Sequence, residues 1–147
     1  MTTEIIRCRR RNMKHTFVFE NYVPKPKARP RKGKNGHFYS PSSAEENVLA
    51  NLAWLQKHEA GFDTITENVF VSIIIESKKK LRGDTDNYVK FVFDALEKAQ
   101  IVKNDKQIKS FFFFCEEGAQ NDKLSVFIRT ETETDLLKKM LEMLKKG

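Results

Sequence analysis

The 147-residue sequence predicts a single α/β (α+β) domain, in which helices pack on one small mixed β-sheet. Strand and helix signals follow one another in the order strand, helix, strand, helix, strand, strand, helix, without an internal repeat. Hydrophobic residues make up 39% of the chain and charged residues 32%, with only 6 Gly and 4 Pro. This composition excludes a disordered or low-complexity chain, and the length allows an ordinary core without disulfide or metal staples.

The first half of the chain predicts one strand and one helix. Residues 16–23 are rich in β-branched and aromatic side chains and end at a proline, which is typical of a strand. A helix is predicted to begin at Ser42 or Ser43, which precede two glutamates at capping-box spacing, and to end at Gly61. One side of this helix is expected to carry Leu49, Leu52, Ala53 and Gln56.

The centre of the chain predicts a buried strand followed by an amphipathic helix. Residues 69–76 form a nearly continuous apolar run, which is typical of a buried strand. Apolar residues then recur at i, i+3, i+4 and i+7, which predicts a helix from Asp86 to about Gln100. Asp84 or Thr85 is expected to cap its start.

The last third predicts two strands and a helix. Apolar and β-branched runs predict strands at 107–115 and 123–130, and the turn signals at 118–122 predict that they form a hairpin. Within the four consecutive Phe at 111–114, two side chains should face the core and two should face an interface. Residues 131–147 carry leucines and methionines at helical spacing, which predicts a C-terminal amphipathic helix.

Positive charge is concentrated near the start of the chain. The formal net charge is +7, and residues 1–41 hold eleven Lys and Arg residues against two Glu. Three prolines within 24–30 hold this segment extended, so that its basic side chains can follow a phosphate backbone. A solvated face is the alternative explanation. The residues expected to bind DNA are Lys25, Lys27, Arg29, Arg31, Lys32 and Lys34, together with Lys78, Lys79, Lys80 and Arg82 of a second basic segment.

Three aspartates and a lysine surround the predicted central helix. Asp84 and Asp86 are two residues apart, so on extended backbone both carboxylates can reach one cation. Lys90 follows one helical turn after Asp86, where its charge can stabilise a phosphate. Asp105 precedes the next strand, where the chain returns toward the same place. Carboxylate oxygens are the ligands that Mg²⁺ prefers, so the three aspartates predict a magnesium site.

Each part of this cluster also has an ordinary structural explanation. An Asp-x-Asp pair before a helix is usually a cap. Asp86 and Lys90 fit an exposed i, i+4 ion pair, and Asp105 fits a turn. Three acids beside a basic patch favour a shared cation, because they would otherwise repel phosphate.

Two motifs here resemble those of a known nuclease family. The first runs from Gly83 to Leu96 and contains Asp-x-Asp-Asn-x-x-Lys followed by Asp-Ala-Leu, and the second is Asp-x-Gln-Ile from Asp105. Together they resemble the RusA-type Holliday junction resolvases over about residues 17–130. The upstream Pro-Lys-Ala-Arg-Pro-Arg and Phe-Tyr-Ser-Pro segments look like the same family's basic N-terminal part. Asn104 departs from the pattern, because a second acid often stands at that position.

The resemblance implies a RusA-like fold and a homodimer that cuts four-way DNA junctions with two symmetric nicks in recombination and repair. It implies that Asp84, Asp86 and Asp105 bind Mg²⁺, for which Mn²⁺ can substitute, and that Lys90 is the catalytic lysine. The whole chain is then one endonuclease domain that needs no small-molecule cofactor.

Two other functions fit the same residues. The chain could be a non-catalytic DNA- or RNA-binding module whose acids only cap a helix. It could also be a metal-dependent nuclease acting on other branched substrates or on RNA, since no motif encodes substrate shape.

The sequence also predicts where the protein acts. It has no apolar run of about 18 residues, so we expect no membrane span, and its first residues do not form a secretory signal. Cys8 and Cys115 are far apart, which excludes a disulfide scaffold and a zinc ribbon. We therefore expect a cytoplasmic protein, associated with the nucleoid when it acts.

Overall fold

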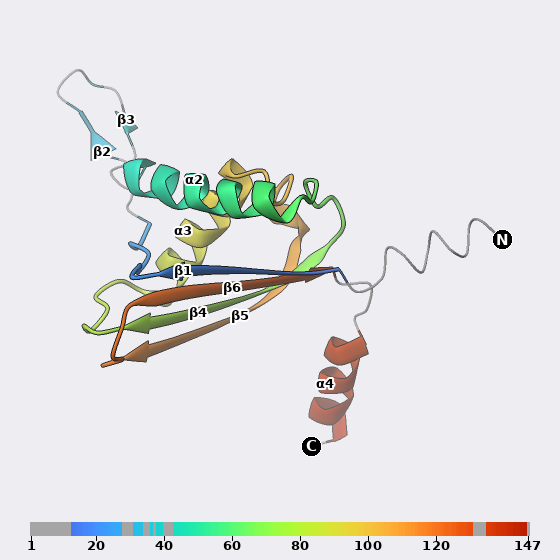
Figure 1. The fold of residues 1–147 in the computed structure, drawn as a ribbon. Coiled ribbons are helices and arrows are strands. Elements are labelled where there is room, and N and C mark those ends of the chain that lie inside the picture. Colours follow the sequence, from blue (N-terminus) through green and yellow to red (C-terminus); the bar gives the residue numbers. More distant parts are fainter. Residues whose placement is uncertain are drawn as a thin grey trace.

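The computed structural model describes residues 13–27, 31–33, 36, 38–39, 43–130 and 135–146. Its helices and strands occur in the order that the sequence predicts, with an additional two-stranded ribbon in the basic segment (Figure 1). The strands are β1 (Lys14–Glu20), β2 (Arg31–Lys32), β3 (Phe38–Tyr39), β4 (Val69–Ser77), β5 (Ile108–Glu117) and β6 (Lys123–Thr130). The helices are α2 (Ser43–Ala60), α3 (Thr85–Lys98), the short 3₁₀ helix η1 (Asp105–Gln107) and α4 (Asp135–Lys146).

Four strands form one mixed sheet in the order β1, β6, β4, β5. β6 is antiparallel to both of its neighbours, whereas β4 and β5 are parallel. A parallel pair cannot be joined by a tight turn, and α3 supplies the longer crossover between them. The mixed sheet with packed helices that the sequence predicts is therefore confirmed.

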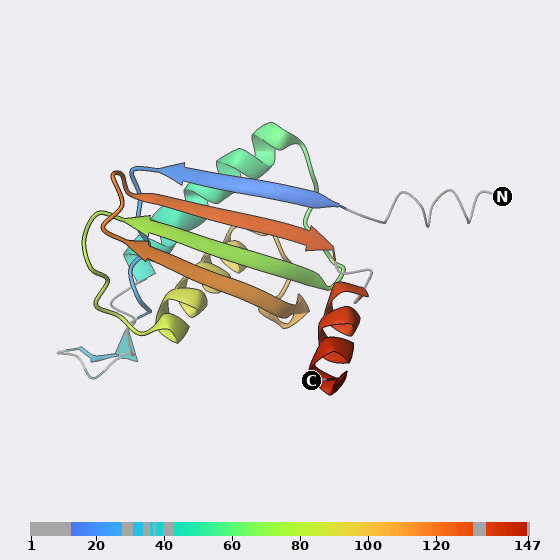
Figure 2. The same ribbon diagram turned by 90° about the horizontal axis from the view of Figure 1, so that it is seen from below.

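The predicted hairpin of the last two strands is wrong. β5 pairs only with β4 within the described sheet, and β4 separates β5 from β6 (Figure 2). The connecting residues 118–122 pass over the end of β4, where the Ala119 amide donates to the Ser77 carbonyl at 2.9 Å. The turn residues mark a reversal of the chain correctly, but turn chemistry does not specify which strand lies alongside.

Helices α2 and α3 cover one face of the sheet, and within the described ranges no helix packs across the opposite face, called the open face below (Figures 1 and 2). The core lies between them. Alternate side chains of β4 point into it and are fully buried, namely Val69, Val71, Ile73 and Ile75. The apolar side of α3 packs against them through Val89, Val92 and Leu96, as its spacing predicts, whereas Phe93 of the same spacing is only partly buried and Phe91 is fully buried instead.

Helix α2 differs in part from its predicted orientation. It begins at Ser43 and ends before Gly61, whose φ of 75° is the left-handed conformation that glycine adopts easily. Leu49 and Ala53 are buried as predicted, but Leu52 is exposed, and the buried positions include Glu46 instead. The Gln56 side chain accepts from the amide and donates to the carbonyl of Val18 on β1, and these bonds fix the helix against the sheet edge.

Strand β1 lies at Lys14–Glu20 and not at the predicted 16–23. It ends where its partner β6 begins, with Glu20 opposite Lys123, and Asn21 then turns the chain with a φ of 54°. None of the helices in the described part of the chain is long and apolar enough to cross a bilayer.

Candidate active site

The N-terminus of α3 carries the first acidic motif. Asp84 is the N-cap residue, with an extended backbone, and its carbonyl accepts from the amides of Asn87 and Tyr88. Its carboxylate makes no capping hydrogen bond, although Asp is a strong N-cap residue. The predicted position of the N-cap is thus confirmed, but the Asp84 side chain accepts no hydrogen bond from the first turn of the helix.

The loop before Asp84 is packed tightly against Pro26, near the start of the basic segment, residues 25–34. A Cβ atom on Gly83 would lie 2.5 Å from the Pro26 side chain and 2.9 Å from Tyr88, so only glycine fits there. The Lys27 amide donates to the Asn87 carbonyl at 2.9 Å, and the Gly83 amide donates to the Tyr88 hydroxyl at 3.3 Å. These contacts hold the basic segment beside the N-terminal end of α3.

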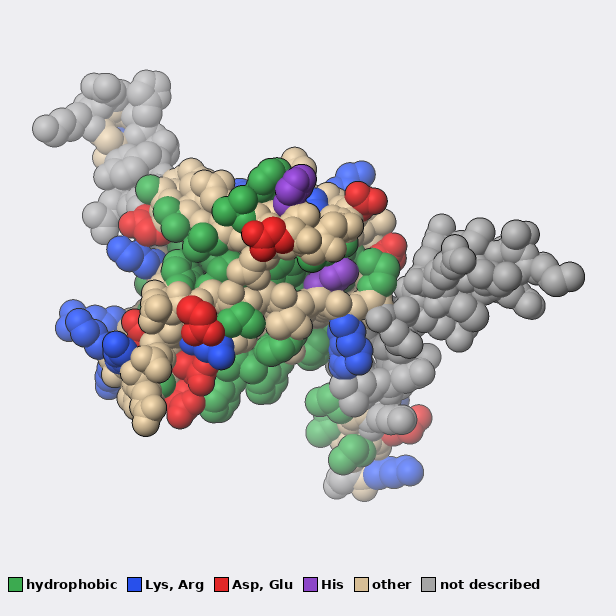
Figure 3. All heavy atoms as spheres, in the orientation of Figure 1, with side chains coloured by type: hydrophobic (Ala, Val, Ile, Leu, Met, Phe, Trp, Pro, Cys, Tyr) green, Lys and Arg blue, Asp and Glu red, His purple; other side chains and the backbone are tan. Residues whose placement is uncertain are grey.

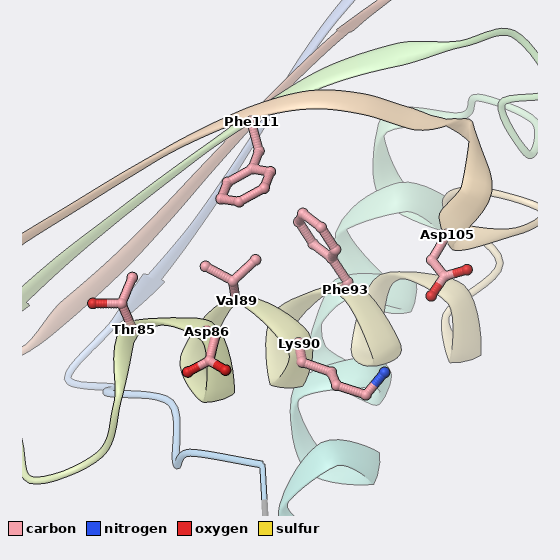
Figure 4. Close-up of a pocket in the computed structure, with 7 residues that line it drawn as sticks. All are labelled: Thr85, Asp86, Val89, Lys90, Phe93, Asp105 and Phe111. Atoms are coloured by element: carbon pink, nitrogen blue, oxygen red, sulfur yellow. The ribbon is translucent and has the colours of Figure 1, made fainter.

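A cavity of about 540 Å³ lies beside α3 and brings both sequence motifs together. Asp86 and Lys90 line it from α3, and Asp105 lines it from η1 (Figure 4). The lysine side chain extends away from Asp86, and no ion pair within 4.0 Å joins these two described residues. The explanation of Lys90 as a partner of Asp86 in an exposed helix pair is therefore not supported.

Two aromatic rings also line this cavity. Phe111 of β5 meets Phe93 of α3 edge to face, with ring centroids 5.5 Å apart. Phe111 and Phe113 face the helices while Phe112 and Phe114 face the other side of the sheet, so the predicted alternation of the four Phe is confirmed, and an interface for the second pair stays a prediction. Phe111, however, lines the cavity and is not buried in the core.

Asp105 is positioned by a network around Gln107. The Asn104 side chain accepts from the Lys106 amide at 2.8 Å, and the Gln107 side chain accepts from the Asn104 amide at 2.7 Å, which together make a capping box. The Gln107 amide group also donates to the carbonyls of Ile65 and Glu67, at 2.8 and 3.0 Å. Asn104, where the family pattern often has an acid, therefore serves to close this turn.

The carboxylates of the cavity have the chemistry that a hard cation requires, although they do not form a closed ligand cluster. No group of three His, Cys, Asp or Glu side chains in the described ranges is close enough to hold a metal ion. Asp86 and Asp105 line the same cavity, and Asp84 is not among its lining residues. Mg²⁺ typically keeps several waters and binds proteins through one or two carboxylates plus substrate phosphates, so these residues fit it.

The predicted DNA-binding residues have different environments. Lys78, Lys79, Lys80 and Arg82 are exposed on the turn between β4 and α3, and Lys32 is exposed on β2. Lys25 is exposed and pairs with Glu45 at 3.4 Å. Arg29, Lys34 and the side chain of Arg31 lie outside the described residues.

Lys27 is not placed as a phosphate contact. Its ammonium group lies 2.7 Å from Glu46 of α2 and 3.1 Å from Asp94 of α3, and Lys98 lies 3.3 Å from Glu46. Burial lowers the pKa of Lys27, but the hydrogen bonds to the two carboxylates outweigh it and raise the pKa overall. Sequence reasoning missed Glu46, which is fully buried; its one signal was its place on the inner side of an otherwise apolar helix face.

Comparison with known proteins agrees with the motifs. The family described as Endodeoxyribonuclease RusA matches residues 21–129, which is more than half of the chain. The chain belongs to the RusA family. It is similar to the crossover junction endodeoxyribonuclease RusA of Aquifex aeolicus (strain VF5), with 28% identity over 97 residues, 65% of this chain and 76% of the relative.

Membership of the RusA family decides the class of the protein. The chain is an endodeoxyribonuclease, an enzyme that hydrolyses phosphodiester bonds, and the alternative of a non-catalytic binding module is set aside. The RusA match contains both acidic motifs and the basic turn, and it ends before α4. Helix α4 is thus a feature of this chain outside the matched region.

Proposed function

We propose that this RusA-family enzyme resolves four-way DNA junctions by paired nicks, as a magnesium-dependent homodimer in recombination and repair. The observation that carries the proposal is the cavity that Asp86 and Lys90 line from α3 and Asp105 lines from η1, so that both acidic motifs face one hollow. Nothing in the packing of the core requires two carboxylates and an ammonium group to share one hollow, whereas this set suits metal-assisted hydrolysis of a phosphodiester.

The residues of the cavity would have different roles in the reaction. Asp86 and Asp105 would hold the cation, with Asp84 beside them at the start of α3. Magnesium supplies Lewis-acid activation of the phosphate and of water. Lys90 would place a positive charge at the scissile phosphate and oppose the negative charge that develops there. Phe93 and Phe111 give the cavity one apolar wall, which strengthens these charge interactions by excluding water.

The surrounding surface suits DNA. Lys78, Lys79, Lys80 and Arg82 are exposed immediately before the acidic loop, and the basic segment is fastened to the same end of α3. Phosphate contacts from these groups would align the strand over the cavity without reading its sequence. Two symmetric copies would suit a substrate in which two strands are cut.

The test is cleavage of a synthetic four-way junction with Mg²⁺ and with EDTA, beside matched duplex, flap and RNA substrates. We expect metal-dependent nicking of the junction in preference to the others. Asp84→Asn, Asp86→Asn and Asp105→Asn should each lower cleavage by about 100-fold or more while binding stays equal or becomes tighter, because a charge that repels phosphate is removed.

Asp63→Asn is the matched control, because Asp63 is exposed and does not line the cavity. It should cleave like the wild type. A preference for flaps or RNA would reject the junction substrate, and normal cleavage by one of the three Asn variants would remove that aspartate from the site.

A further inference from the structure

The cavity beside α3 is lined by apolar as well as charged side chains. The apolar ones are Val89, Phe93 and Phe111, and the charged ones are the two aspartates and the lysine described above. A cation and a phosphate group need only the charged side chains, because both are bound through polar contacts. The volume of about 540 Å³ lies within the range of about 300–1,000 Å³ that is typical of sites for small organic molecules. The apolar part of the cavity therefore suits a further portion of the substrate.

Phe111 is exposed although it stands on the core side of the sheet. It lies in register with Val71 of β4, which is fully buried, and on the same side of β5 as Phe113, which packs against the core. Phe111 is nevertheless 51% exposed. Phe112 and Phe114 point to the open face, where Figure 3 shows hydrophobic side chains along the underside of the sheet. Among the four rings, Phe111 is thus the one that shares a hollow with the charged side chains of the site.

Phe93 supports the Phe111 ring from the helix. The two rings meet edge to face, with centroids 5.5 Å apart and an angle of 88° between their planes. Figure 4 shows them directed toward one another from α3 and β5. This contact covers only part of Phe111, as its exposure shows, and leaves ring surface for a second contact. A ring that is already held by a neighbour loses little conformational entropy when a ligand packs on it.

We propose that Phe111 packs its ring against the nucleoside next to the scissile phosphate. The inference rests on the proposed function and identifies a further substrate contact of the same site. A nucleoside is bonded directly to the phosphate that the charged side chains would hold, so both sets of side chains would contact one nucleotide. Nucleobases present flat π-surfaces, and they stack on aromatic side chains in many proteins that bind single strands.

This contact would favour DNA near a branch point. In a continuous duplex the neighbouring pairs cover both faces of each base, so a base can pack on Phe111 only after it leaves the stack. The cost of leaving is lowest where pairing is already interrupted. The ring would not read the identity of the base, because every base has a π-face.

The test combines a protein variant with a DNA modification. Wild-type cleavage of a synthetic four-way junction first locates the nicked phosphate, and an abasic site then replaces each of the two flanking nucleotides in turn. The second-order rate constant is measured under single-turnover conditions, at enzyme concentrations below saturation. Phe111→Ala should lower it by about 10-fold or more on the intact junction, as should one of the two abasic sites in the wild type. Together they should cause no further loss, because each change removes the same contact.

Two variants separate the ring from its place in the fold. Phe111→Tyr retains the ring and should retain both the rate and the sensitivity to the abasic site. Trp54→Ala removes an aromatic side chain of α2 that is 45% exposed and does not line the cavity, so it should cleave like the wild type. Circular dichroism and thermal unfolding verify that each variant is folded. Phe111→Leu, which retains apolar volume without a flat ring, replaces Phe111→Ala if the latter does not fold.

The result separates this inference from the proposed function. A normal rate for Phe111→Ala would overturn the ring contact alone, as would losses that multiply at both abasic positions. A wild type that cleaves flaps or RNA in preference to junctions would reject the junction substrate, and the same measurements on the preferred substrate would then decide the ring contact. A wild type that cleaves none of these substrates would overturn both.

Discussion

Lys90 projects from α3 into the cavity while the opposite side of the same turn is buried through Val89, Phe91 and Val92. Lys90→Ala should therefore change the free energy of unfolding by no more than about 0.5 kcal/mol. Cleavage should fall by about 100-fold, the effect expected from the loss of one preorganised charge at the reacting phosphate. Single-turnover rates at saturating enzyme and Mg²⁺ measure this effect without a contribution from binding.

The control for Lys90 is Lys103→Ala, which removes an exposed lysine that does not line the cavity. It should cleave normally. Lys90→Arg should restore only part of the rate, because the charge is spread over a wider planar group. A normal rate for Lys90→Ala would show that this lysine takes no part in the reaction.

Gln107 is the residue that positions Asp105, through its bonds to Asn104, Ile65 and Glu67. Gln107→Ala leaves one amide and two carbonyls without their partner, which should cost about 1–3 kcal/mol of stability. A displaced Asp105 should lower the single-turnover rate by about 10-fold or more with little change in junction affinity, because reactive geometry is lost.

Two further variants show whether the effect of Gln107→Ala comes from its lost hydrogen bonds. Gln120→Ala, at an exposed position in the loop after β5, should leave both stability and rate unchanged. Gln107→Glu retains the acceptor for the Asn104 amide but cannot donate to the two carbonyls, so it should not restore the rate. Full activity of Gln107→Ala would mean that Asp105 is held in place without it.

At the scale of elements, Lys27 joins three parts of the chain. Its ammonium group contacts Glu46 of α2 and Asp94 of α3. Lys27 itself lies near the start of the basic segment. Lys27→Met removes the ammonium group that lies 2.7 Å from the buried Glu46 and 3.1 Å from Asp94, so the chain should lose about 3 kcal/mol of stability. Lys25→Met, two residues away, breaks only an exposed pair with Glu45 and should cost at most about 1 kcal/mol.

The same pair of variants makes a pH prediction. The pKa of Lys27 is raised in the folded protein, so its contribution is fully present below its ordinary value of 10.5 and is lost as the pH rises through the folded value. The difference in unfolding free energy between wild type and Lys27→Met should therefore shrink above about pH 10.5. Urea unfolding between neutral and alkaline pH measures it, and a difference that grows with pH would contradict the ion pairs.

At the scale of the whole molecule, the exposed lysines beside the cavity should give most of the salt dependence of DNA binding. Lys79→Ala with Lys80→Ala removes two charges next to the acidic loop. We expect weaker junction binding and a log–log salt slope that is smaller by about 1.8, because two fewer counterions are displaced. Fluorescence anisotropy across a salt titration measures the slope.

The matched control removes the same number of charges elsewhere. Lys145→Ala with Lys146→Ala changes the end of α4, which lies outside the matched RusA region. Its slope should equal that of the wild type. If both double variants lowered the slope by the same amount, net charge, and not the turn between β4 and α3, would govern binding.

The sequence by itself determined the longer helices and strands, the acidic motifs and the family of this protein. Strand and helix boundaries agree closely in the core, where β6 occupies the predicted residues and α3 begins within one residue of its predicted start. These signals are local, because hydrophobic period, caps and turn residues act within a few positions of the chain. The two acidic motifs were likewise readable, since their spacing is contained within single segments.

Only the tertiary structure decided which elements meet. It placed β4 between β5 and β6. It also paired the Lys27 ammonium group with the Glu46 carboxylate, and it brought Asp105 and Lys90 to the same cavity. It also placed both α2 and α3 on the same face of the sheet. Such outcomes depend on contacts between segments far apart in the chain, and the same local signals are compatible with several strand orders, so no local pattern specifies them.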